Sequence, residues 1–230
     1  MHLVKRLDSG WAFARTYTGI KKLKAEADLR VNQPEELVSL ICQYARGYLK
    51  PIQNEKELAF LVKEVRRLKP RTVLEIGTAK GGTLFLWTRL AQLDATIVSI
   101  DLPGGKFGGG YTNRRALVYR RFAGPEQKLH LLQEDSHESS TRTKAETLFA
   151  GKPVDFLFID GDHTYEGVKQ DWEMYSRLVR PGGMIGFHDI AGNYDDTEVK
   201  RLWDSIKSNF QHKEYAVDPK GYYGIGVIYL

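Results

Sequence analysis

Apolar residues in this chain alternate between short continuous runs and longer segments with helical spacing. The short runs have the character of buried strands, and they occur at 72–76, 96–100, 129–132, 156–159 and 184–187. Segments with apolar residues three or four positions apart predict helices, and they occur at 58–68, 84–93, 112–122 and 168–178. Because strands and helices alternate, the pattern predicts an α/β fold with a mostly parallel sheet and helices on both faces.

The two ends of the chain are less regular. Residues 1–32 have no clean period, and Pro34 begins a further predicted helix with Leu37, Ile41 and Tyr44 on one face. Later segments complete the expected elements: a helix at 196–210 and strands at 215–217 and 225–229. We therefore expect an N-terminal helical extension at 1–54 and one larger domain at 55–230.

The segment RTVLEIGTAKGGT, at 71–83, joins an apolar strand to a glycine-rich turn and then to a helix. In open α/β sheets, ligands bind at the carboxyl ends of strands, beside such turns. A dinucleotide fingerprint requires G-x-G-x-x-G. Here Glu75 stands at the first glycine position, which gives E-x-G-x-x-x-G-G. The spacing disfavours a nicotinamide site, although a glycine turn also occurs as simple fold punctuation.

Asp101 follows the second predicted strand, about 20 residues beyond the glycine turn. A carboxylate there can accept hydrogen bonds from two ribose hydroxyls, and the alternative is a helix cap or a loop charge. The glycine-dense segment 103–111 comes next. It forms either a flap over the site or a long turn. A high density of glycine indicates a flexible backbone, but it does not indicate a function.

Two neighbouring predicted strands end in polar residues. Asp160 and His163 follow the strand at 156–159, and His188 and Asp189 follow the strand at 184–187. The carboxyl ends of parallel strands meet at one edge, so we expect these four side chains in one crevice. A divalent cation would compensate the gathered anions and orient a substrate hydroxyl, and His163 could remove its proton. In the alternative reading, His188 bonds the backbone and Asp189 caps the next segment.

LEIGTAKGGT, IDGDHTYEGV, LVRPGG and HDI together resemble class I S-adenosylmethionine (SAM)-dependent methyltransferases. They are most similar to bacterial small-molecule O-methyltransferases of the macrolide-sugar and cephalosporin-pathway type, and more distantly to catechol-type enzymes. The resemblance covers about residues 55–189. It implies a Rossmann-like fold with seven strands, of which the last is antiparallel and lies beside the fifth.

The resemblance also implies roles for individual residues. Asp135, with Ser136 beside it, would bond the adenine amino group, and His163 would be the catalytic base. The expected cofactor-binding residues are Glu75, Gly77, Thr78, Gly81, Gly82, Thr83, Asp101, Asp135, Ser136 and Asp160. The expected metal ligands are Asp160, His188 and Asp189. Relatives often have a carboxylate where this chain has His188, and imidazole suits manganese better than magnesium, so the metal is left as Mg or Mn.

Composition narrows the function classes. The chain has 230 residues, a net charge of +5 and the single cysteine Cys42, which fits a reducing compartment and a cytoplasmic location. The sequence has neither a signal-peptide pattern nor a run of about 20 apolar residues, so we expect no membrane partner. Basic clusters can contact nucleic acid, but they are equally typical of solvated helix faces, so we do not favour that partner. Aromatic residues of the N-terminal helices, including Trp11 and Tyr48, could form a homo-oligomer interface.

The leading hypothesis is a metal-assisted O-methyltransferase that acts on a small hydroxylated molecule, a sugar or natural product. The alternatives are a nicotinamide-dependent oxidoreductase, a nucleic-acid methyltransferase and a non-catalytic cofactor-binding regulator. Against a nucleic-acid enzyme, residues 160–163 read DGDH rather than the proline-rich tetrapeptide of amino-methylating DNA enzymes. Cys42 also lies too early to be a cytosine-methylation nucleophile.

Overall fold

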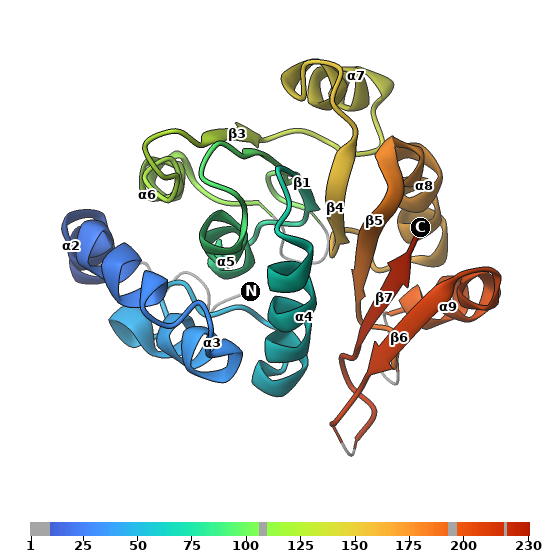
Figure 1. Cartoon of the computed structure of the whole chain (residues 1–230), viewed down its shortest axis with the longest axis horizontal. Coiled ribbons are helices and arrows are strands. Elements are labelled where there is room, and N and C mark those ends of the chain that lie inside the picture. The colour runs from blue at the N-terminus through green and yellow to red at the C-terminus, as the bar shows by residue number, and fades with distance from the viewer. Residues whose placement is uncertain (1–9, 106–109, 193–196, 219) are drawn as a thin grey trace.

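The computed structural model describes residues 10–105, 110–192, 197–218 and 220–230. Within these ranges, seven strands form one sheet in the order β3-β2-β1-β4-β5-β7-β6 (Figure 1). The strands are β1 (Thr72–Ile76), β2 (Thr96–Ile100), β3 (Lys128–Leu132), β4 (Val154–Ile159), β5 (Val179–His188), β6 (Gln211–Tyr215) and β7 (Ile225–Tyr229).

The pairing of the strands confirms the predicted sheet. Strands β1 to β5 pair in parallel, and β7 is antiparallel to both β5 and β6. Ile76 of β1 lies opposite Ile100 of β2 and Ile159 of β4. The residues that follow these three strands therefore leave the sheet side by side, at the point where the strand order reverses.

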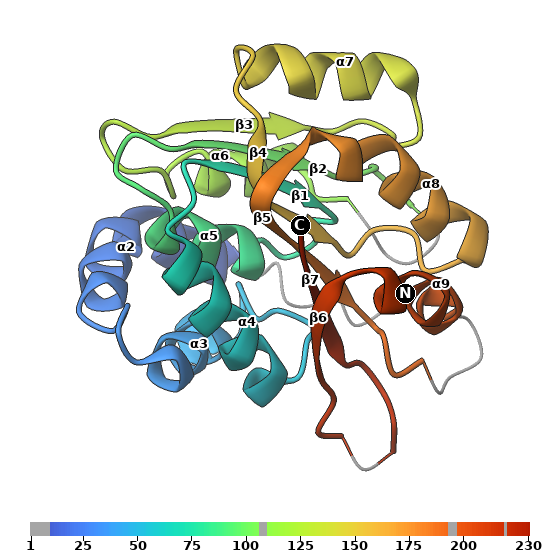
Figure 2. The same ribbon diagram turned by 45° about the vertical axis from the view of Figure 1, so that its right-hand side comes forward.

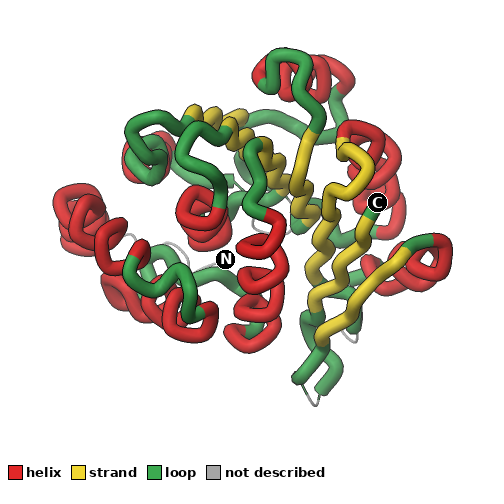
Figure 3. Tube along the Cα trace, in the orientation of Figure 1, coloured by secondary structure: helices red, strands yellow, loops and turns green. Residues whose placement is uncertain are grey.

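Helices cover both faces of the sheet (Figures 1 and 2). One face carries α2 (Gly10–Asp28), α3 (Pro34–Gln43), α4 (Glu55–Leu68), α5 (Gly82–Leu90) and α6 (Asn113–Tyr119). The other face carries α7 (Ser139–Leu148), α8 (Tyr165–Tyr175) and α9 (Val199–Ile206). Short 3₁₀ turns are η1 (Tyr44–Arg46), η2 (Ser176–Leu178) and η3 (Lys207–Asn209). Figure 3 shows the strands between the two groups of helices.

Helix α4 shows how the sequence specifies these elements. The Asn54 side chain caps it by accepting from the backbone N–H of Lys56 at 3.0 Å, and acidic residues occupy its first turn. Its apolar face, which includes Leu58, Leu61 and Val65, is fully buried. The predicted helix at 58–68 is confirmed, and it begins three residues earlier than the apolar pattern indicates.

Three elements differ from the sequence prediction. Helix α7 was not predicted, because only Thr141 and Ala145 of its ten residues are buried and its apolar period is weak. Strand β6 was expected at 215–217 but ends at Tyr215, and all five of its residues are exposed, so no apolar run marks it. Strand β5 was expected at 184–187 but begins at Val179, so Pro181 lies inside it, where the pairing register with β4 shifts.

The N-terminal helices share a buried core with the sheet. Ile20 of α2 and Leu37 of α3 belong to the same apolar cluster as Leu61 of α4 and Val73 of β1. The division at residue 54 and the homo-oligomer interface remain predictions. Parts of the expected flap, residues 106–109, and the expected helix start Asp196 lie outside the described residues. In the described ranges, each helix is too short or too polar to span a bilayer.

Gly77 is the position where the fold most requires glycine. Its φ is +94°, and a Cβ there would overlap the backbone carbonyl of Asp160 at the end of β4. We expect Gly77→Ala to lower the free energy of unfolding by about 3 kcal/mol, because backbone strain and steric overlap add. Gly151 has φ +77° but open space around it, so Gly151→Ala should cost only about 1 kcal/mol. Equal losses in chemical denaturation would contradict this explanation.

Candidate active site

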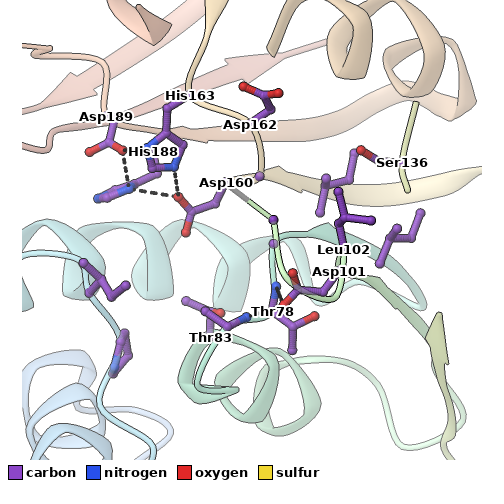
Figure 4. Close-up of a pocket in the computed structure, with 18 of the residues that line it drawn as sticks. Thr78, Thr83, Asp101, Leu102, Ser136, Asp160, Asp162, His163, His188 and Asp189 are labelled. Atoms are coloured by element: carbon purple, nitrogen blue, oxygen red, sulfur yellow. Dashed lines mark hydrogen bonds and ion pairs between the residues drawn. The ribbon is translucent and has the colours of Figure 1, made fainter. Parts of the chain in front are cut away.

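A cavity of about 600 Å³ opens at the carboxyl ends of the parallel strands (Figure 4). Loops after β1 to β5 line it, so it lies where the sheet topology predicts a ligand site. Lining residues that were expected from the sequence are Gly77, Thr78, Gly82, Thr83, Asp101, Asp135, Ser136, Asp160, His163, His188 and Asp189. The structure therefore brings eleven of the thirteen expected site residues to one cavity.

Glu75 and Gly81 are the two expected residues that do not line the cavity. Side chains alternate along β1, so Glu75 points into the α5 side, where its fully buried carboxylate accepts from Trp87 Nε1 at 2.8 Å and Ser99 Oγ at 2.7 Å. A Cβ on Gly81 would lie 2.6 Å from the Tyr119 ring. Both residues therefore pack against the helices behind the cavity rather than forming its surface.

Asp101 holds the glycine turn in shape. Its Oδ2 accepts from the backbone N–H groups of Thr78 at 3.1 Å and Ala79 at 2.6 Å, and its Oδ1 accepts from Gly110 N–H at 2.7 Å. Burial raises the pKa of Asp101, although these amide hydrogen bonds favour the carboxylate and oppose the shift. Asp101 also lines the cavity. Its two oxygens accept from the backbone of the turn and of Gly110.

The loop after β3 forms the wall beyond Asp101. Asp135 Oδ1 accepts from the backbone N–H of His137 at 2.9 Å, and the Ser136 carbonyl accepts from the Tyr175 hydroxyl at 2.7 Å. His137 also lines the cavity, and its Nε2 is 3.4 Å from the buried Asp171. The nearby Asp171 carboxylate raises the pKa of His137 to about 9 despite partial burial. His137 was not predicted, since its role depends on a partner from α8.

Two aspartates and two histidines meet at the other end of the cavity (Figure 4). His188 Nδ1 lies 3.0 Å from Asp160 Oδ1 and 3.3 Å from Asp189 Oδ2. His163 Nδ1 lies 3.4 Å from Asp189 Oδ2, and its Nε2 lies 3.9 Å from Asp160 Oδ1. Burial alone would lower the pKa of His188, but the two carboxylates outweigh it and raise the pKa to about 10. The His188 ring thus lies against both carboxylates.

Asp160, His163 and Asp189 each offer one ligand atom, and these atoms lie within 4.8 Å of one another. The spacing and the mixed oxygen and nitrogen donors suit a divalent cation such as Mn²⁺. The group differs from the expected ligand set in one member, because His163 stands where His188 was expected. The Nδ1 of His188 instead lies against both carboxylates.

Segments far from the strand ends also reach this cluster. Gln53, which precedes α4, donates from Nε2 to Asp160 Oδ2. Tyr223, from the loop between β6 and β7, stacks on His188 with ring centroids 5.8 Å apart, and Tyr222 lines the same cavity. The sequence pattern gave no signal for these residues, because only the tertiary fold brings them to the site.

A family model described as a methyltransferase domain matches residues 74–190, which are 117 of the 230 residues. The chain belongs to the methyltransferase-domain family. The match begins inside β1 and ends just after Asp189, so it contains every expected site residue. Gln53, Tyr222 and Tyr223 lie outside the matched methyltransferase region.

Two curated relatives share part of this sequence. An uncharacterized protein of Acanthamoeba polyphaga mimivirus is 28% identical over 145 residues, 63% of each chain. The uncharacterized protein y4gI of Sinorhizobium fredii is 26% identical over 149 residues, 62% of this chain and 16% of that protein. The chain thus spans less than two thirds of the length of these curated relatives.

Two solved structures share the fold. An O-methyltransferase from Bacillus cereus in complex with SAH has 18% identity and a TM-score of 0.56, and the likeness covers 89% of this chain and 91% of that one. The O-methyltransferase TomG from Streptomyces achromogenes, in complex with SAM, has 15% identity, a TM-score of 0.54 and full coverage of both chains. The methyltransferase therefore has the Rossmann-like class I fold, as its sequence predicts.

The buried Glu75 makes stability depend on pH. Burial raises the pKa of Glu75 from 4.5 to about 8, so between these values the folded protein binds more protons than the unfolded chain. The free energy of unfolding then falls as pH rises through this window, by up to about 1.4 kcal/mol for each pH unit. We expect Glu75→Gln to lack this contribution, which denaturant melts of both proteins from pH 5 to 8 would measure. Parallel pH profiles would show that Glu75 is ionised throughout.

Proposed function

We propose that this methyltransferase transfers a methyl group from SAM to a hydroxyl group of a small molecule, with a divalent cation at Asp160 and Asp189. One observation carries the proposal. A single cavity joins the glycine turn and Asp101, at one end, to a cluster of carboxylates and imidazoles at the other. The first end suits a nucleoside, and the second suits the activation of a hydroxyl.

The nucleoside end supplies fixed polar groups. Asp101 lies at the tip of β2, the position from which a carboxylate can accept from ribose hydroxyls. Asp135 and Ser136 lie beside it after β3 and can bond the adenine edge. Gly77 brings the turn and the end of β4 into backbone contact, so the methionine part of SAM would extend toward Asp160. The related O-methyltransferases in complex with SAH or SAM support SAM as the cofactor.

His163 is the proposed base. Its side chain is 22% exposed and lines the cavity, so a bound hydroxyl can approach the ring. The hydroxyl oxygen attacks the methyl carbon, a C–O bond forms as the S–C bond breaks, and the proton moves to His163. A bound divalent cation would lower the pKa of the hydroxyl and orient its oxygen. His163 can alternatively serve as the third cation ligand, because its nitrogens lie near both carboxylates.

Family membership weighs against two of the alternatives. The methyltransferase assignment removes the support for a nicotinamide-dependent oxidoreductase. It also gives no support to a cofactor-binding regulator, which would bind SAM without turnover. A nucleic-acid acceptor stays disfavoured on the sequence argument, and affinity for DNA or RNA that falls with salt would revive it.

Calorimetric binding of SAH tests the cofactor site. We expect SAH to bind with and without a chelator, since the nucleoside end lies apart from the cation cluster. Asp101→Asn should weaken binding about tenfold or more, because it removes a charged acceptor at the turn. Asp94 pairs with Arg71 at 2.6 Å on the surface, so Asp94→Asn is the matched control and should bind normally. A wild-type protein that does not bind SAH would overturn the proposed function.

Titration with Mn²⁺, followed by the electron paramagnetic resonance of the free ion, tests the cation site. Asp160→Asn and Asp189→Asn should each lower Mn²⁺ affinity at least about tenfold, because each removes a charged ligand. Asp162 Oδ1 is occupied by the backbone N–H and the hydroxyl of Thr164, both at 2.8 Å, so Asp162→Asn should bind Mn²⁺ normally. Unchanged affinity in both ligand variants would eliminate the cation site.

His163→Gln distinguishes the two roles of this histidine. If His163 is the base, Mn²⁺ affinity persists while methyl transfer is lost. If His163 is a ligand, Mn²⁺ affinity falls together with transfer.

A further inference from the structure

Two segments outside the methyltransferase-matched region line the cavity, and each reaches its cation end through one residue. Residues 50–53 precede α4, and Tyr222 and Tyr223 belong to the loop between β6 and β7. Gln53 contacts Asp160, and Tyr223 stacks on His188, so both segments adjoin the reactive cluster. We call them the N-terminal wall (50–53) and the C-terminal wall (222–223).

Helix α4 anchors both walls. The N-terminal wall leads directly into its capping residue, Asn54. Glu57, in the first turn, is fully buried, and its two oxygens accept from the backbone N–H groups of Val217 at 2.8 Å and Gly224 at 2.9 Å. One carboxylate therefore ties both ends of the loop that carries the C-terminal wall. That loop also bonds the segment after Asp189, since Ala191 N–H donates to the Tyr223 carbonyl at 2.9 Å.

The surface of the two walls is largely apolar. Ile52 is 57% exposed and Tyr222 is 37% exposed, and both line the cavity with Pro51. The charged residue of the N-terminal wall, Lys50, lies 3.8 Å from Glu55. At this end of the cavity, polar side chains concentrate in the cluster around Asp160 and in Gln53 beside it. An exposed apolar surface beside a single polar cluster fits a ligand that is apolar except at one edge.

We propose that the two walls bind the methyl acceptor and that this acceptor is a hydroxylated aromatic ring. The inference rests on the proposed function and names its substrate class. A flat ring can stack on the tyrosines while its hydroxyl reaches Asp160 and His163. A free sugar carries hydroxyls around its ring, and those placed against Ile52 and Tyr222 would lose water without gaining partners, which is costly. The aromatic class is therefore favoured over the sugar.

Probe binding to the SAH complex tests the acceptor class. We use 2-naphthol as the aromatic probe and methyl β-glucoside as the sugar probe, and measure each affinity by ligand-observed NMR titration. The SAH complex should bind 2-naphthol more tightly than the glucoside. Tyr222→Ala and Ile52→Ala should each weaken 2-naphthol binding about three- to tenfold, because they remove ring contacts. Leu93 is 77% exposed outside the cavity, so Leu93→Ala should bind 2-naphthol normally.

Glu57 is a positioning residue. A variant at this position tests whether the geometry of the C-terminal wall affects probe binding when the protein remains folded. Glu57→Gln retains one acceptor oxygen for the two loop amides, so we expect weaker 2-naphthol binding with unchanged SAH affinity and unchanged far-ultraviolet circular dichroism. A purely structural role would lower both affinities together. If Glu57→Gln does not fold, Tyr222→Ala still decides the role of the wall.

The outcomes separate this inference from the function on which it rests. Tighter binding of the glucoside, unchanged 2-naphthol binding in Tyr222→Ala, or binding of neither probe to a protein that binds SAH would overturn the acceptor class alone. Failure of SAH binding would instead overturn the proposed function.

Discussion

The backbone contact between Gly77 and Asp160 is the constraint on which the site depends. It places the turn after β1 against the end of β4, at the point where the strand order reverses. Only a residue without a Cβ allows this approach. Because the two chain segments touch, the groups after β2 and β3 and those after β4 and β5 share one cavity. Without this contact, the glycine turn and the cluster around Asp160 would not adjoin one cavity.

Fixed polar partners of the buried carboxyl groups also shape the site. His188 lies between Asp160 and Asp189, and the amides of the glycine turn surround Asp101. Glu75 is supported by Trp87 and Ser99 behind the turn. These contacts fix the geometry of Asp101, Asp160 and Asp189 in the cavity wall and of Glu75 behind it.

The sequence predicted the fold and most of the cavity, because strand ends and helical periods are local signals. Eleven expected residues line the cavity, but a motif does not reveal which way a side chain points. Alternation along β1 turns Glu75 toward α5. Gln53 and Tyr223 come from segments whose position is fixed by long-range contacts such as the bonds of Glu57. Strand β6 was misplaced because an exposed edge strand has no apolar period.

The position of β7 has a consequence for how the chain folds during synthesis. Strand β7 lies between β5 and β6 but follows β6 in the chain, so β6 has no neighbour in the sheet until β7 has left the ribosome. Until then, the edge of β5 that pairs with β7, including Ile185 and Phe187, stays open to association with other chains. This edge of β5 is therefore protected only after the β6–β7 hairpin has been synthesised.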